Sequence, residues 1–369
     1  MEALRLSLLS LIFSLCILTT QAHPGTAKKT LDGLVSLAHR QTVSTTELLA
    51  NLQALPDSLL SPAGSAIKNI LLGNRAAASP QDLTTLYTPP GALGSAACSA
   101  DACCVYSYAA DDMAAVFREP SSARGGECTE LARQAVRLAF HDAGTWSKTA
   151  GGGGADGSVI LAGEWALRAE NRGLGGIAPL VQALYDRYRP HGARMADLVQ
   201  LAATVAAVSC PLGPRVRSFV GRNDSAVPAP EGRLPDVRAG AAELVALFAD
   251  KTVPLGELIA LIGAHSVSTQ LFVDLARAGA PQDTTPGVWD VLWYNQTISE
   301  PPPPGVFRFP SDVALSRYPG AQDFWAVFMN SQAVWADAYA AAYVRLSVLG
   351  VEHVNALKEC TGVLPLPVS

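Results

Sequence analysis

The stretch "VRLAFHDAG" at residues 136–144 places two polar side chains, Arg137 and His141, in an otherwise apolar helical pattern. Their spacing puts them one turn apart on the same face of the predicted helix. Glu130 and Gln134 extend this polar stripe toward the amino end. Such a stripe predicts a helix that faces a polar cavity. Taken alone, it also fits a core histidine bonded to a backbone carbonyl, beside an arginine whose charged end reaches the surface.

The composition indicates a globular protein. The 369 residues are 49% hydrophobic and 16% charged, with a formal net charge of -5. This is enough apolar material for a substantial core, while the acidic balance and the lack of a basic patch in the sequence argue against a nucleic-acid partner. From about residue 96 onward, helical periodicities follow one another with almost no period-2 alternation. We therefore expect a mostly α fold.

Residues 1–22 have the features of a secretory signal peptide, namely a charge near the start, an apolar run and a small-residue exit at Ala22. The apolar run is short for a membrane anchor, so we expect a secreted, extracellular protein with no membrane association after cleavage. Cleavage leaves six of the seven cysteines, and an even number in a secreted chain predicts three disulfides among fifteen possible pairings. Sequons at Asn223 and Asn295 predict glycosylation.

Residues 23–95 differ in composition from the rest of the chain. They contain a capping box that begins at Ser44 and a second helix start at Ser79, where proline occupies the first helical position. We interpret this segment as a small helical extension or pro-segment, to which the sequence assigns no function. Residues 96–369 form the main domain.

A cluster of oxygen donors follows the first histidine. Asp142 comes directly after His141, and "GADGS" at residues 154–158 supplies Asp156 and Ser158 together with glycines that allow backbone carbonyls, such as that of Gly154, to turn inward. Calcium takes six to eight such oxygens. Read alone, the glycine-rich stretch also fits a flexible linker or a phosphate-binding turn, although it lacks the lysine and spacing of a P-loop.

A second histidine lies in "LGELIALIGAHSVS" at residues 255–268, at the end of a strongly apolar helical pattern. A buried neutral imidazole can hold a transition metal, although a core histidine is the alternative. Ser266 follows His265 at once, and "QDTTPGVWD" at residues 282–290 supplies further oxygen donors. The arrangement at the first histidine is thus repeated here.

In order along the chain, "VRLAFHDAG", "GGGGADGS", "ENRGL", "CPLGPRVRSFVGR", "IGAHSVS" and "DTTPGVWD" closely resemble the motifs of the secreted fungal haem peroxidases, class II of the plant-type peroxidase superfamily. The resemblance runs from about Cys98 to the carboxyl end. It implies a two-domain fold with the haem between a distal helical half, at about residues 96–230, and a proximal helical half, at about residues 231–369.

The resemblance also implies the activity and its cofactors. It predicts a monomeric hydrogen-peroxide-dependent oxidoreductase that takes electrons from small aromatic reductants and holds one haem b and two calcium ions. The haem is expected to be non-covalent because the sequence has no CxxCH motif. The implied haem-site residues are the distal group Arg137, Phe140 and His141, the orienting Asn171, the axial ligand His265, and Asp312 as the acceptor of its free N–H.

Calcium ligands and disulfides are implied in the same way. The implied ligands are Asp142, Gly154, Asp156 and Ser158 for the distal ion, and Ser266, Asp283, Thr285, Val288 and Asp290 for the proximal ion. The implied bridges are Cys98 with Cys104, Cys103 with Cys360, and Cys128 with Cys210. Asn171 lies seven residues after Glu164, where relatives usually have six, which leaves the role of Glu164 open.

Several positions depart from the family pattern. Where manganese-oxidising members place three acids, this chain has Glu130, Gln134 and Leu271, so we expect no strong manganese site. The position of the exposed tryptophan that oxidises bulky substrates is Ala260, and a proximal aromatic position holds Gln282. We therefore expect a generic or low-redox-potential enzyme that oxidises phenols and dyes by one-electron steps at the haem edge.

Two other functions fit parts of this sequence. The chain could be a calcium-stabilised haem-binding or cell-wall-binding glycoprotein that has lost turnover, but it keeps the complete set Arg137, His141, His265 and Asp312. A serine hydrolase that uses Ser266 would need a G-x-S-x-G elbow after a strand, which the sequence around this serine lacks.

Overall fold

The computed structural model describes residue 52 and residues 55–73, 85–118 and 126–368. The predicted signal peptide and the helix starts at Ser44 and Ser79 lie outside the described residues. The described chain is mostly helical, as predicted, and its two short strands, β1 (Phe219–Val220) and β2 (Lys358–Glu359), pair antiparallel.

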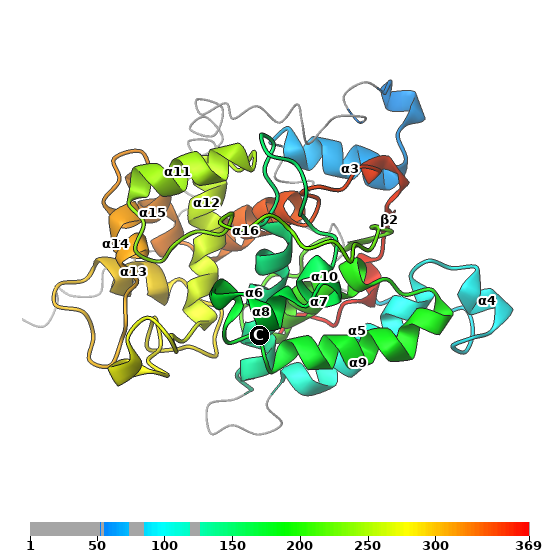
Figure 1. Cartoon of the computed structure of the whole chain (residues 1–369), viewed down its shortest axis with the longest axis horizontal. Coiled ribbons are helices and arrows are strands. Elements are labelled where there is room, and N and C mark those ends of the chain that lie inside the picture. Colours follow the sequence, from blue (N-terminus) through cyan, green and yellow to red (C-terminus); the bar gives the residue numbers. More distant parts are fainter. Residues whose placement is uncertain (1–51, 53–54, 74–84, 119–125, 369) are drawn as a thin grey trace, which may run out of the picture.

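The helices of the first half surround a central buried helix. α10 is buried along its whole length, and it packs against α6, near the centre of Figure 1, and α5, at the lower right. Most of its residues are apolar, as expected for a helix with no solvent face, and its polar Asp197 and Gln200 are buried within the fold. The elements of this half are α4 (Ala96–Ser99), α5 (Cys104–Phe117), α6 (Glu130–Ala143), α7 (Ser158–Leu161), α8 (Glu164–Leu167), η3 (Ala169–Asn171), α9 (Ile177–Tyr188), η4 (Arg189–His191) and α10 (Met195–Ser209).

α11 to α15 gather on the left of Figure 1, α16 runs from them toward the middle of the molecule, and the carboxyl-terminal segment continues to the right. α12 packs against α15 and α16, so the segment that carries His265 rests on a helical layer. The elements are α11 (Ala241–Asp250), α12 (Leu255–Ile262), η5 (Gly263–Val267), η6 (Leu275–Arg277), α13 (Leu292–Ile298), α14 (Pro310–Ser316), α15 (Gln322–Met329), α16 (Gln332–Leu346), η7 (Val354–Ala356) and η8 (Thr361–Val363).

Two helical segments differ from the periodicity. The helical pattern of residues 158–169 is divided into two short helices, because Gly163 adopts a left-handed conformation at φ 71° and separates α7 from α8. The apolar helical pattern that leads to His265 ends as an α-helix at Ile262 and continues as the 3-10 helix η5. His265 therefore lies on the tighter helix, just beyond the end of α12.

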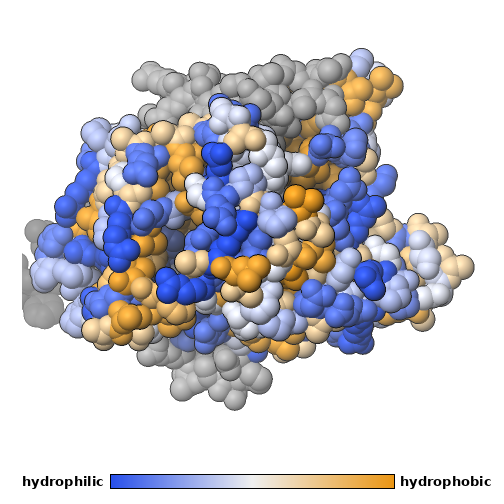
Figure 2. All heavy atoms as spheres, in the orientation of Figure 1, coloured by the Kyte–Doolittle hydropathy of each residue, from blue (hydrophilic) through white to orange (hydrophobic). Residues whose placement is uncertain are grey.

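Part of the amino-terminal segment packs into the same core as the rest. It contains η1 (Asp57–Leu59) and α3 (Pro62–Leu71), whose Ile67 and Ile70 are 0% and 2% exposed and which packs against α16. The Ser61 hydroxyl caps α3 and donates to the Asn355 carbonyl at 2.8 Å. In Figure 2, polar and apolar residues are mixed over most of the visible face, with an apolar group at the upper right, over the η1 and α3 end of the segment.

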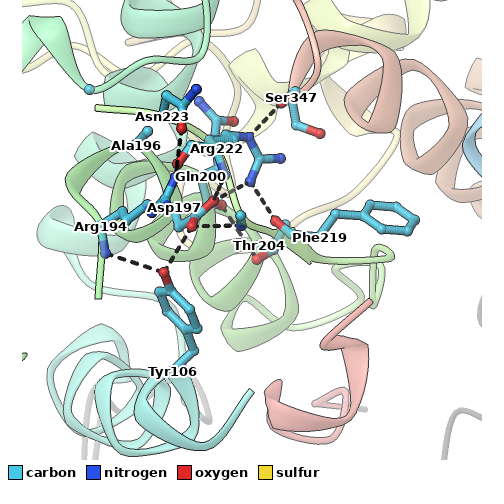
Figure 3. A network of polar contacts seen from close by, with 12 residues as sticks. Tyr106, Arg194, Ala196, Asp197, Gln200, Thr204, Phe219, Arg222, Asn223 and Ser347 are labelled. Atoms are coloured by element: carbon cyan, nitrogen blue, oxygen red, sulfur yellow. Dashed lines mark hydrogen bonds and ion pairs between the residues drawn. The ribbon is translucent and has the colours of Figure 1, made fainter. Parts of the chain in front are cut away.

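A buried ion pair joins three parts of the fold (Figure 3). The Asp197 carboxylate, on α10, accepts from Tyr106 Oη at 2.8 Å and from Arg222 Nη1 at 2.9 Å. Arg222 Nε donates to the Ser347 carbonyl at 2.8 Å, just beyond α16. Both charged side chains are at most 1% exposed. Removing either partner would leave an unpaired buried charge, which typically costs about 3–5 kcal/mol.

The three disulfides have the pairing that the family resemblance implied, which confirms this prediction. They join Cys98 to Cys104, Cys103 to Cys360, and Cys128 to Cys210. The second bridge spans 257 residues, so it ties the start of α5 to the carboxyl-terminal segment.

Candidate active site

One cavity contains both histidines that the sequence singled out. It has a volume of about 670 Å³, within the range of ligand pockets, and His141 from α6 and His265 from η5 both line it. Arg137, Phe140 and Asp312 line the same cavity. The structure therefore brings together residues that lie far apart in the sequence.

The His141 ring is held by Asn171. Its Nδ1 lies 2.7 Å from Asn171 Oδ1, and Asn171 Nδ2 donates to the Glu164 carbonyl at 3.0 Å. Because the amide nitrogen is committed to that carbonyl, the amide oxygen must face the imidazole, which then carries its proton on Nδ1. Nε2 keeps its lone pair.

The surroundings of His141 favour the neutral imidazole. Burial lowers its pKa well below the ordinary value, and the Arg137 charge lowers it further, although the hydrogen bond to Asn171 opposes the shift. The Phe140 ring makes an edge contact with His141 at 5.8 Å between centroids and stacks on Phe248. A neutral base with a fixed tautomer therefore faces the cavity.

Glu164 acts on this group through its backbone. Its carbonyl orients Asn171, whereas its carboxylate accepts from the Ala229 amide at 2.7 Å and pairs with Arg168 at 2.8 Å. The seven-residue spacing to Asn171 is accommodated in this way, which the sequence alone left open.

Arg137 is anchored at the cavity wall. Its Nη1 and Nη2 each donate at 2.7 Å to backbone carbonyls, those of Arg172 and Glu170. Burial lowers the pKa of Arg137 to about 10, so the side chain stays cationic at neutral pH. Since guanidinium has five N–H donors, these two bonds leave others for a ligand in the cavity.

His265 is held by a carboxylate instead of an amide. Its Nδ1 lies 2.9 Å from Asp312 Oδ2, in the first turn of α14, and the Asp312 side chain is 3% exposed. An ionised carboxylate can only accept, so Nδ1 carries the proton and Nε2 is free for a ligand. The His265 side chain is 32% exposed, and the rings of Trp293 and Phe309 contact its edges.

The distal oxygen donors meet behind His141. The Asp142 carboxylate accepts from the Gly157 and Val159 amides, and Asp156 accepts from the Ser158 amide. Burial raises the pKa of Asp142 well above its ordinary value, and the charge of the neighbouring Asp156 raises it further. The buried Ser158 hydroxyl has no hydrogen-bond partner. Two crowded carboxylates beside an unpartnered hydroxyl fit a bound cation.

The proximal oxygen donors form a similar cluster. Asp283 is fully buried, with its Oδ2 unpartnered, and the buried Ser266 hydroxyl is also without a partner. Thr285 Oγ1 donates to Asp290 Oδ2 at 3.0 Å, and the Val288 carbonyl accepts from the Asp290 amide. Burial raises the pKa of Asp283 to about 8. A cation would satisfy the orphaned oxygens and restore both carboxylates to their charged form.

The chemistry of both clusters suits a hard cation. Within the described ranges, no three His, Cys, Asp or Glu side chains lie together in an arrangement that could hold a metal ion. Each cluster has two carboxylates, and hydroxyl and carbonyl oxygens provide its other possible ligands. Calcium accepts this mixed oxygen set, whereas transition metals favour nitrogen and sulfur ligands.

The departures from the family pattern have structural roles. Gln134 Oε1 accepts from the first amide of α9, that of Ile177, and its Nε2 donates to Glu130, each at 3.0 Å. The fully buried Gln282 donates to Ser268 Oγ at 2.8 Å, and its Oε1 has no partner. Ala260 is buried against α16, where a side chain could not reach solvent.

Sequence reasoning missed several cavity residues. Tyr339 and Tyr343 of α16 line the cavity, as does Phe272. Phe272 is 43% exposed, and Arg172 lies over its ring at 5.3 Å. No motif marks these positions, because they reach the cavity only through the packing of α16 and of the loop after η5.

The two sequon asparagines, Asn223 and Asn295, are both exposed. No helix in the described part of the chain has the length and apolarity needed to cross a bilayer.

Comparison with known proteins agrees with this site. Residues 109–331 match the family model described as Peroxidase. The chain is 32% identical to a peroxidase from Coprinopsis cinerea and 31% identical to one from Arthromyces ramosus, in each case over 76% of this chain and 82% of the relative. It is 31% identical to a low-redox-potential peroxidase from Taiwanofungus camphoratus, over 60% of this chain and 70% of the relative. With two anchored imidazoles in one cavity and matches of this extent, the chain belongs to the peroxidase family and is a hydrogen-peroxide-dependent oxidoreductase.

Proposed function

We propose that this protein is a secreted haem peroxidase that oxidises small phenolic or dye-like donors by one-electron steps at the edge of the cavity. The observation that carries the proposal is the pair of imidazoles. His141 and His265 both anchor Nδ1 to a protein oxygen, and both leave Nε2 free at the wall of one cavity.

The cavity residues fit a non-covalent haem. Val136, Phe140, Leu258 and Leu261 add apolar lining, and His265 Nε2 would hold the haem iron. Haem, when bound there, supplies a redox-active iron that exchanges electrons with hydrogen peroxide and with the donor. Asp312 orients His265 and increases its electron density through the Nδ1–H bond, which strengthens it as a ligand.

The distal residues handle the proton and the charge. His141 Nε2 takes a proton from hydrogen peroxide and returns it to the departing oxygen, so that the leaving group departs as water. Arg137 stabilises the negative charge that develops as the O–O bond breaks. Asn171 acts as a positioning residue, because its amide fixes the tautomer that leaves Nε2 basic.

The donor is proposed to be a small organic molecule. The Gln134 amide is fully used in bonds to Ile177 and Glu130, and Leu271 offers no oxygen, which argues against a strong manganese site. The apolar rim of Leu271 and Phe272 suits an aromatic donor instead. The resemblance to a relative named a low-redox-potential peroxidase supports the same class.

Calcium and secretion complete the proposal. We propose one calcium ion at the Asp142 cluster and one at the Asp283 cluster, where they stabilise the segments that carry His141 and His265. Three disulfides and two exposed sequon asparagines suit an extracellular, glycosylated monomer.

The test uses the full chain loaded with haem. We expect a Soret band that shifts on addition of hydrogen peroxide, followed by turnover of a phenol and a dye and little turnover of Mn(II) or veratryl alcohol. A protein that fails to bind haem, or whose spectrum ignores peroxide, would overturn the proposal. Efficient Mn(II) oxidation would contradict the donor class alone.

A further inference from the structure

A group of buried oxidisable rings lies behind His265. Four of the six tryptophans of the chain belong to it, and every member is at most 2% exposed. The rings come from α13, α15, α16 and the loop before α13. We call this group the aromatic chain, and its members are Trp289, Trp293, Tyr294, Trp325, Trp335, Tyr339 and Tyr343.

The aromatic chain starts at the proximal histidine. The Trp293 ring lies 5.8 Å from the His265 ring, between centroids, in an edge contact. Trp325 lies 5.2 Å from Trp293, and Tyr294 lies 4.9 Å from Trp293. The first steps away from the histidine are thus direct ring contacts.

The contacts continue until they reach the cavity again. Trp335 follows Tyr294 at 5.7 Å and stacks on Trp289 at 5.6 Å, and Tyr339 lies 4.8 Å from Trp289. Tyr339 stacks in turn on Tyr343, and both tyrosines line the cavity. Electron transfer falls steeply with distance, so a series of touching rings is a path that separated rings cannot provide.

The polar contacts of two of the indoles favour positive charge on them, whereas the buried Trp289 Nε1 has no hydrogen-bond partner. Trp325 Nε1 donates to the Tyr294 carbonyl and Trp335 Nε1 to the Ala260 carbonyl, each at 3.0 Å. A carbonyl oxygen that accepts from an indole N–H is attracted more strongly once the ring has lost an electron. Packing alone would be served by phenylalanine, which has no N–H to satisfy.

The phenols are less suited to hold the charge. A tyrosine that is oxidised at neutral pH releases its phenolic proton. Here Tyr294 Oη donates to the Ile259 carbonyl at 2.7 Å, and Tyr343 Oη donates to Gln200 oxygens. Neither acceptor is a base that could take the proton. The tryptophans therefore hold the positive charge more stably than the tyrosines.

We propose that the aromatic chain is a second redox site, which supplies an electron to the oxidised cavity when no donor is present. The proposal rests on the proposed function, because hydrogen peroxide is the oxidant. Its reduction to two waters takes two electrons and two protons: the bound haem would supply one electron, the aromatic chain supplies the other, and the two protons come from solvent. One electron leaves the Trp293 indole toward the His265 side, and Trp325 or Trp335 refills Trp293. No bond forms and no proton is lost, so a tryptophan cation radical remains.

The aromatic chain then has a protective consequence. The electron removed from the tryptophans is returned by an organic donor that reaches the cavity, along the same ring contact between His265 and Trp293. When no donor is present, the oxidising equivalent is held on the buried rings. It therefore does not oxidise the side chains that line the cavity. The enzyme should therefore survive more turnovers when donor is scarce.

The test is rapid-freeze electron paramagnetic resonance of the haem-loaded full chain after one equivalent of hydrogen peroxide without donor. We expect a tryptophan radical signal that Trp293→Phe abolishes, together with a several-fold loss in the number of peroxide turnovers before inactivation. Trp165→Phe is the matched control, because Trp165 lies on α8 outside the aromatic chain. This control should leave the signal unchanged.

The failure of this inference can be told apart from that of the proposed function. If the Soret band responds to peroxide and phenol turnover is normal, but the wild type shows no tryptophan radical, the aromatic chain is not a redox site. A tryptophan radical signal that is as strong in Trp293→Phe as in the wild type would also show that the aromatic chain is not a redox site. If Trp293→Phe does not fold, Trp335→Phe replaces it, and mass spectrometry of peroxide-treated wild type should find oxidised tryptophan in residues 289–335 and none at Trp165.

Discussion

The two sides of the cavity hold the same side chain with different partners. His141 bonds to the amide oxygen of Asn171, whereas His265 bonds to the carboxylate of Asp312. An amide fixes the tautomer without adding charge, so the distal ring remains a base that can take and release a proton. A carboxylate adds electron density, so the proximal ring becomes a stronger ligand. The difference shows that one hydrogen bond at Nδ1 assigns a histidine its task.

The largest expected effect tests the distal side. Replacing His141 by leucine removes the proton acceptor, so the rate of the peroxide reaction should fall by about 10²–10⁴-fold. Stopped-flow recording of the Soret change measures this rate. The control is His353→Ala, because His353 is exposed. A rate near that of the wild type in His141→Leu would show that the distal base has been misassigned.

Removing calcium tests whether each side of the cavity depends on its own ion. A chelator should lower the free energy of unfolding by about 2.7 kcal/mol for each site that was held at a hundredfold excess over its Kd. Chemical unfolding with and without chelator measures the loss. Ser158→Ala should weaken the distal site, and Ser266→Ala the proximal site. Equal stability with and without chelator in all three proteins would remove calcium from the proposal.

Replacing Asp312 by asparagine makes the proximal partner resemble the distal one. The amide gives His265 less electron density, so haem retention or turnover should fall by about 10–100-fold and the reduction potential should rise. Haem release kinetics and a spectroelectrochemical titration measure the two effects. Asp323→Asn, at an exposed position in the first turn of α15, is the matched control. An unchanged potential would mean that the His265–Asp312 bond has no electronic role.

The converse change, Asn171→Asp, has the smallest expected effect at neutral pH. The pKa of His141 is well below its ordinary value, so its neutral form persists in mild acid. A carboxylate at position 171 would raise this pKa, because it favours imidazolium. As the pH falls below the raised pKa, the peroxide reaction should slow about tenfold per pH unit.

The pH profile of the peroxide reaction checks this shift. The Asn171→Asp variant should show an acid limb at higher pH than the wild type. Asn330→Asp adds the same charge at an exposed site and should keep the profile of the wild type. Superimposable profiles for Asn171→Asp and the wild type would contradict the role given to the Asn171 amide.

The sequence was most informative where the chain is locally periodic. The spacing of Arg137 and His141 placed both on one face of α6, and both line the cavity. The segment that follows the glycine-rich stretch was less readable, because the left-handed conformation of Gly163 that separates α7 from α8 does not show in periodicity. The pairing of the cysteines came from family resemblance, since six cysteines alone leave fifteen possibilities.

By itself, the sequence determined the helical class, the register of α6 and the motif series that relates the chain to peroxidases. Only the tertiary structure decided which partner each histidine has, since Asn171 lies 30 residues from His141 and Asp312 lies 47 residues from His265. It alone showed the aromatic chain, whose rings come from separate elements. The physical reason is that helical periodicity is a property of neighbouring residues, whereas contacts between distant segments depend on how all the helices pack.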